Sequence, residues 1–177
     1  MRMRSTRSCS KRCGARRERA TLRAVSDFAP SQVVSGRPTE VRFAWRAEVA
    51  DAELVTLTQS HGGASEAGWW NRIRPHSLGW VSARADDGRL VGFVNVAWDG
   101  GDHAFLIDTK VHPDYQRRGI GTELARIAAR QAKDAGCEWM EVDFGDHLSS
   151  FYYDACGFLP TQAGLLHLPD IQPRDPA

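Results

Sequence analysis

Cysteine is scarce in this 177-residue chain, and no apolar run is long enough to cross a membrane as a helix. The four cysteines, at positions 9, 13, 137 and 156, form no C-x-x-C pair, which excludes the usual zinc-site and thioredoxin-like spacings. The G-x-G-x-x-G and G-x-x-x-x-G-K-[ST] signatures of nucleotide-binding folds are also missing. We therefore expect one domain with free thiols in the cytoplasm, with no metal site and no membrane partner.

Net charge is small, at +1, but the two signs are unevenly spread. Residues 1–23 hold nine basic residues and one acidic residue, whereas the remainder holds 14 basic and 21 acidic residues. An acidic body argues against nucleic-acid binding and mildly favours a cationic substrate. Residues 1–38, rich in Arg and Ser, are expected to form a disordered extension. A tail for an anionic partner, an organelle transit peptide and an upstream start site are the alternatives.

One stretch stands out, the junction between a buried strand over residues 104–111 and a helix that begins near residue 120. Apolar residues recur at helical spacing until Gly136, which is placed for a left-handed cap. Gly119 and Gly121 leave the first amides of this helix open to a close ligand. Unpaired amides and the helix dipole favour an anion such as phosphate, and two arginines just before Gly119 add positive charge.

The rest of the chain predicts a mixed sheet. Strands are expected near residues 41–47, 80–85, 89–98, 104–111, 138–144 and 164–168. Helices are expected near residues 51–60, 66–74, 120–136 and 148–156. Asp51 is expected to cap the first helix, and the Asp-Gly step at 87–88 to close a hairpin. An antiparallel meander, a crossover helix and a further strand together give an α/β domain. The strand after the crossover helix is expected to lie parallel to the strand before that helix.

Two motifs in this framework resemble those of one enzyme family. Residues 116–121 read Gln-Arg-Arg-Gly-Ile-Gly, preceded by Val-x-Pro, and are similar to the Gln/Arg-x-x-Gly-x-Gly/Ala acyl-coenzyme A loop of the GNAT family of N-acetyltransferases. Residues 151–158, Phe-Tyr-Tyr-Asp-Ala-Cys-Gly-Phe, resemble the family's Leu-Tyr-Glu-Lys-Leu-Gly-Phe. The resemblance implies a mostly antiparallel mixed sheet, splayed at its central strands with helices on both faces. It also implies a domain over residues 39–168, a flexible tail over 169–177, and acetyl-CoA as co-substrate.

The resemblance implies a set of cofactor contacts as well. The backbone of Val111, with His112 as a further candidate, would hydrogen-bond the pantetheine arm, and amides of the glycine loop would hold the pyrophosphate. The remaining residues implied to bind the cofactor are Gln116, Arg117, Arg118, Gly119, Ile120, Gly121, Thr122 and Asp146. Asp146 departs from the family, which commonly has Asn there, because an ionised carboxylate cannot donate a hydrogen bond.

Acetyl transfer to an amine needs a base for the amine and a proton for the departing thiolate. Tyr153 aligns with the family tyrosine that gives this proton, and core packing is its alternative role. The resemblance offers Asp108 as the base, and an ion pair with Lys110 on the same strand face is the alternative. The weaker base candidates are Asp143, His112 and His147.

Two further groups have a functional and a structural interpretation. Cys156 could carry an acyl group, but no base lies beside it in the sequence, so a buried packing role is favoured. Trp69 and Trp70 fall where the acceptor-site helices of the family lie, with core packing as the equal alternative.

The sequence therefore predicts an N-acetyltransferase that moves acetyl from acetyl-CoA to a primary amine of a small molecule or peptide, in a ternary complex. A non-catalytic module that binds or senses acyl-CoA is the first alternative. An anion-binding or nucleic-acid-binding protein led by the Arg-rich extension is the second. A homodimer is a further expectation from the resemblance.

Overall fold

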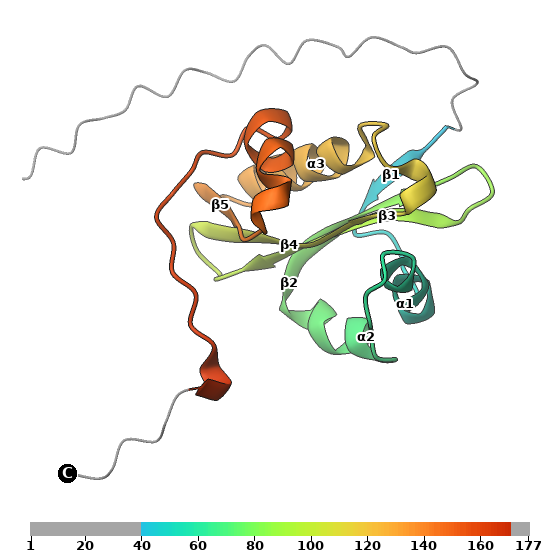
Figure 1. Ribbon diagram of the computed structural model, residues 1–177, viewed down its shortest axis with the longest axis horizontal. Coiled ribbons are helices and arrows are strands. Elements are labelled where there is room, and N and C mark those ends of the chain that lie inside the picture. Colours follow the sequence, from blue (N-terminus) through green and yellow to red (C-terminus); the bar gives the residue numbers. More distant parts are fainter. Residues whose placement is uncertain (1–39, 171–177) are drawn as a thin grey trace, which may run out of the picture. The chain divides into compact units, whose positions relative to one another are not determined.

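The computed structural model of the protein describes residues 40–170 (Figure 1). The extension predicted over residues 1–38 lies outside these residues, as does most of the tail predicted over 169–177. Among the described residues, no helix has both the length and the apolar character needed to span a bilayer.

A five-stranded sheet keeps the order of the sequence, from the first strand at one edge to the last at the other (Figure 1). Its strands are β1 (Arg42–Trp45), β2 (Ser77–Arg84), β3 (Leu90–Trp98), β4 (His103–Val111) and β5 (Trp139–Val142). The first four strands are antiparallel, and β5 runs parallel to β4. The mixed, mostly antiparallel sheet is thereby confirmed, and so is the parallel strand that follows the crossover helix.

β5 pairs along its whole length with only the first part of β4. The ladder runs from His103 opposite Trp139 to Leu106 opposite Val142, where β5 ends. Over the remaining residues of β4, up to Val111, no described strand lies on that side. Part of the β4 backbone edge is therefore without a ladder partner, on the side where the splay of the two strands was predicted.

Helices cover both faces of the sheet (Figure 1). On one face lies α3 (Ile120–Asp134), whose buried Ile120, Leu124 and Ala128 pack with the valines of β2 and β3. On the other face lie α1 (Asp51–Gln59) and α2 (Trp69–Ile73), which enclose Trp70 and Phe93 in a second core. The N-cap residue of α2 and that of α3 are both glycines with positive φ.

Two expectations for the C-terminal region need correction. The strand predicted near residues 164–168 is wrong: residues 157–167 carry no helix or strand, a 3₁₀ turn covers Leu168–Asp170, and Leu165 is 90% exposed. Apolar residues alone cannot make a strand, because the backbone also needs a ladder partner. The helix predicted over residues 148–156 is a 3₁₀ turn (Asp146–Leu148) followed by a π-helix, η4 (Ser150–Ala155).

The prediction that Asp51 caps α1 is also wrong. Ala50 is the N-cap residue, and Asp51 is the first residue of the helix. The Asp51 carboxylate instead accepts hydrogen bonds from the backbone N–H groups of Gly68, at 2.6 Å, and Trp70, at 2.8 Å. Asp51 therefore satisfies open donors at the start of α2 and fixes α2 to α1.

An ion pair between Glu53 of α1 and Arg84 of β2 joins this helix layer to the sheet, with 2.5 Å between Glu53 Oε1 and Arg84 Nη1. The hydrogen bond from Arg84 lowers the pKa of Glu53 from its ordinary value of 4.5. Because the folded value is the lower one, the pair stabilises the protein above pH 4.5, and this contribution is lost as the pH falls through the folded value.

We expect Glu53→Gln to lower the free energy of unfolding at pH 7 by up to about 1 kcal/mol, measured by urea denaturation. The difference from the wild type should shrink as the pH falls below 4.5. Glu123→Gln, which breaks an exposed pair with Arg126 within α3, is the control and should have a smaller effect. A Glu53→Gln difference that stays constant into acid would show that the pair is not its cause.

Candidate active site

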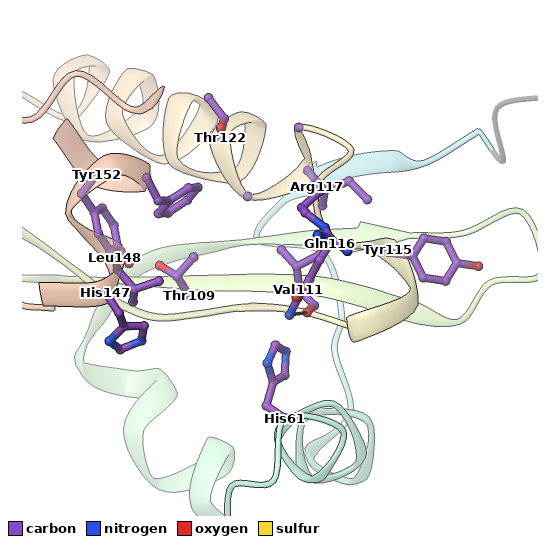
Figure 2. A pocket seen from close by; sticks show the side chains of 14 residues that line it. His61, Thr109, Val111, Tyr115, Gln116, Arg117, Thr122, His147, Leu148 and Tyr152 are labelled. Atoms are coloured by element: carbon purple, nitrogen blue, oxygen red, sulfur yellow. Dashed lines mark hydrogen bonds between the residues drawn. The ribbon is translucent and has the colours of Figure 1, made fainter. Parts of the chain in front are cut away.

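A cavity of about 540 Å³ lies where β4 leaves β5 (Figure 2). The loop before α3 and the first turn of α3 form one wall, and Thr109 and Val111 of β4 form another. The segment from His147 to Tyr152 and the side chain of His61 complete it. The cavity therefore joins the glycine loop to the unpaired part of β4.

Two residues of the glycine loop have positive φ. Gly119, the N-cap residue of α3, has a φ of 77°, and Arg117 has a φ of 58°. No side chain caps α3, so first-turn N–H groups of this helix keep their capacity to donate. A Cβ at Gly121 would lie only 3.0 Å from the ring of Phe151, which explains the second glycine by close packing. The loop can thus present amides and a helix dipole to an anion.

The end of β4 is held in place by two different contacts. Gln116 Nε2 donates to the carbonyl of Val111 at 3.1 Å, which ties the loop to the strand. The N–H of His112 donates to Val91 on β3 at 2.8 Å, so it is already engaged on the far side of the strand. Val111, but not His112, lines the cavity. The backbone position that faces the cavity is therefore the one at Val111.

Two of the predicted cofactor contacts have side chains elsewhere. The guanidinium of Arg118 lies 5.1 Å from the ring centre of Tyr115, a ring that Arg89 also contacts. Asp146 begins a 3₁₀ turn and is exposed, and its carbonyl accepts from Ser149. Neither Arg118 nor Asp146 lines the cavity, whereas the predicted residues Gln116, Arg117, Gly119, Ile120, Gly121 and Thr122 all do.

Of the two adjacent tyrosines, Tyr152 lines the cavity and Tyr153 does not. Tyr152 is only 5% exposed, and burial raises the pKa of its phenol. Its phenol lies near the buried hydroxyl of Thr109, and the two side chains point toward each other in Figure 2. Within the described residues, this hydroxyl has no hydrogen-bond partner of normal geometry. Tyr153 is half-buried and packs edge-on against Phe144, with 5.2 Å between the ring centres.

Asp108 lies on an irregular turn of the β4 backbone. Two residues, Asp108 and Thr109, stand opposite one residue of β3, and Asp108 has a φ of 58°, which is uncommon outside glycine. Its carboxylate is 3.2 Å from the ammonium of Lys110, so the predicted ion pair is present. Lys110 Nζ lies in turn 4.7 Å from the ring centre of Trp69. A carboxylate, an ammonium and an aromatic face therefore meet on the α1–α2 side of β4.

Cys156 is not suited to carry an acyl group. Burial raises the pKa of its thiol to about 11, against a smaller opposite effect of a hydrogen bond with Thr122. The thiol is then almost entirely protonated at neutral pH, and the thiolate is the nucleophilic form. The buried packing role fits this environment.

Sequence reasoning missed His61, Thr109 and Phe151, all of which line the cavity. Thr109 lies beside predicted residues without a motif signal, and Phe151 begins the second motif but was given no site role. His61 follows α1, about 55 positions before the glycine loop, so only the fold brings it to the cavity.

The model of the acetyltransferase (GNAT) family matches residues 44–158 of the chain. Among curated proteins, mycothiol acetyltransferase of Mycolicibacterium smegmatis is 39% identical over 106 residues, which cover 54% of this chain and 35% of that protein. Streptothricin acetyltransferase of Streptomyces lavendulae is 33% identical over 118 residues, which cover 65% of this chain and 62% of that protein. The chain thus spans less than two thirds of the length of either relative.

Solved structures agree on the fold. Aminoglycoside N-acetyltransferase AAC(6')-Iy in complex with CoA has a TM-score of 0.58 to this chain at 20% identity, and the match covers 76% of this chain and 97% of that one.

The positive φ of Gly119 in the glycine loop can be tested by substitution. Gly119 has positive φ in open space, so Gly119→Ala should lower the free energy of unfolding by about 1 kcal/mol through the backbone alone. Gly119→Asn should cost less, because Asn tolerates this conformation better. Urea denaturation of both variants makes the comparison, and equal losses would mean that something other than the backbone angle is responsible.

Proposed function

Since the chain belongs to the GNAT family of acetyltransferases, we propose that it moves an acetyl group from acetyl-CoA to a primary amine by direct attack in a ternary complex. The observation that carries this proposal is the single cavity that both the α3 N-terminus and the unpaired end of β4 line. A phosphate suits the first element, and an extended amide-containing arm suits the second.

The residues present fit an acyl-CoA molecule. Open amides at the α3 N-terminus would receive the pyrophosphate, and the Val111 backbone would pair with the pantetheine arm. The bound co-substrate supplies a thioester carbonyl for the amine to attack. CoA in the complex of the aminoglycoside enzyme, which shares this fold, supports the same choice of co-substrate here.

For the acceptor we propose a small molecule with a primary amine. The names of the two curated relatives specify small molecules, and an acidic body would attract a cation. Asp108, next to Lys110 and Trp69, is proposed to attract the ammonium group of the acceptor. The free thiols of Cys137 and Cys156 suit a reducing, cytoplasmic setting, and a homodimer stays a prediction.

Tyr153 is proposed to give the departing thiolate its proton, because it holds the tyrosine position of the family motif. Tyr152 is the second candidate, because it lines the cavity. The raised pKa of Cys156 supports direct attack by the amine, because an acyl-enzyme on this thiol would need a thiolate.

The first experiment is calorimetric titration of acetyl-CoA into the full chain. A Gly119→Glu, Gly121→Glu variant should lose binding by at least about tenfold, because it adds two negative charges at the α3 N-terminus, where the pyrophosphate would bind. A Gly100→Glu, Gly164→Glu variant is the matched control, since it changes one positive-φ glycine and one other glycine away from the cavity. Absence of binding by the folded wild type would refute the proposed function.

Binding without transfer would instead favour the sensing module. Streptothricin, neamine and spermidine make a first panel of acceptors, with release of free CoA thiol as the measured product. If none reacts although acetyl-CoA binds, the acceptor panel is widened to basic peptides before the enzyme hypothesis is replaced by the sensor.

Tyr153→Phe should lower kcat by about 100-fold while the Kd of acetyl-CoA stays unchanged, because only the acidic proton is removed. Tyr152→Phe keeps the buried ring and should have a much smaller effect. The reverse pattern would move the acid to Tyr152, which already lies in the cavity wall.

A further inference from the structure

His61 is held at the cavity mouth by the turn that ends α1. Its N–H donates to the carbonyl of Thr58 at 3.1 Å, and Gly62, with a φ of 76°, reverses the chain directly after it. The imidazole lines the cavity and hydrogen-bonds the backbone of Val111. Figure 2 shows the ring reaching from the end of α1 toward Val111 on β4. The imidazole of His61, just after α1, therefore lies beside β4 in the cavity wall.

The surroundings of His61 lower the pKa of its ring. Partial burial lowers the pKa of His61 most, and the positive charges of His112 and Lys110 lower it further. The hydrogen bond with Val111 acts in the opposite direction, as expected when the ring donates to the carbonyl. Asp108 faces Lys110 at 3.2 Å, and His147 of the turn Asp146–Leu148 lines the same cavity. One ring nitrogen therefore donates to Val111, and the other is a free acceptor at neutral pH.

Asp108, the base suggested by the sequence, is in a different situation. Its carboxylate already has a cationic partner in Lys110, and it does not line the cavity. His61 does line the cavity and is an exposed residue, so it can pass a proton on to solvent. Of the two base candidates, His61 and not Asp108 is therefore placed to contact a ligand in the cavity.

We propose that His61 is the catalytic base that removes a proton from the ammonium group of the acceptor. This inference rests on the proposed function. The acceptor arrives as R–NH₃⁺ and gives one proton to the free imidazole nitrogen, which leaves R–NH₂ and an imidazolium. The amine nitrogen then bonds to the thioester carbonyl carbon, and the carbon–sulfur bond breaks.

The remaining protons balance within the site. The thiolate takes a proton from the tyrosine phenol, and the new amide nitrogen returns its surplus proton to that phenolate. His61 releases its proton to solvent. The net change is one ammonium and one thioester converted into one amide, one thiol and one free proton.

His61→Gln tests the role, because glutamine can still donate to the Val111 carbonyl but cannot take a proton. With whichever of streptothricin, neamine and spermidine reacts fastest, kcat at pH 7 should fall about 100-fold. The loss should diminish toward alkaline pH, where the amine is neutral by itself, and the limb of the pH profile due to His61 should disappear. The Kd of acetyl-CoA should stay unchanged. His103→Gln, the matched control at a histidine outside the cavity, should leave the profile in place.

A readout independent of turnover is the NMR titration of the imidazole signals. One histidine signal should be lost in His61→Gln, and in the wild type it should titrate below the ordinary value of 6.5. A His61→Gln chain with wild-type kcat and pH profile overturns the role of His61 and leaves the proposed function standing. A wild type that transfers acetyl to no amine overturns both. A loss of acetyl-CoA affinity that matches the loss of kcat shows a structural role instead, which also overturns the proposal.

Discussion

The early end of β5 beside β4 is the constraint on which the site depends. β5 ends after four residue pairs, so one backbone edge of β4 has no ladder partner where the glycine loop begins, while its other edge stays paired with β3. Unpaired backbone groups in a folded protein are costly unless water or a ligand satisfies them. The strand end and the open N-terminus of α3 thus expose donors and acceptors to one cavity, and both can be satisfied by one long, partly anionic ligand.

The acceptor side of the site depends on a different set of long-range contacts. Asp51 holds the start of α2, and Glu53 holds α1 to β2, so the layer that carries Trp69 and His61 is fixed against the sheet by carboxylates. The bulge at Asp108 then turns that side chain toward Lys110, which packs on Trp69. A backbone conformation that costs about 1 kcal/mol or more is held there by its surroundings, as is common at functional sites.

Local signals in the sequence predicted local structure well. The strand, the glycine loop and α3 follow one another within 32 residues, and the positive φ values of Gly119 and Gly136 match the turn and the cap that their positions indicated. What failed were features set by distant partners. Asp51 had the right chemistry for a cap but bonds amides 17 and 19 positions away. The apolar residues near 166 were expected to form a strand but have no ladder to join. His61 carried no signal, since its meaning comes entirely from the packing of α1 on β4.

In the proposed reaction, the two substrates would meet β4 in different ways. The open backbone edge of β4 lies beside the α3 N-terminus, where amides and carbonyls would bind the co-substrate with little dependence on side-chain identity. The face toward α1 and α2 carries Asp108 and Lys110, where side chains would bind the acceptor and can vary freely. This division would explain why motifs in the sequence point to the co-substrate and not to the acceptor. His61 stands where the two regions adjoin, in contact with the Val111 backbone and near the charge of Lys110, which is the position that a proton acceptor for the incoming amine requires.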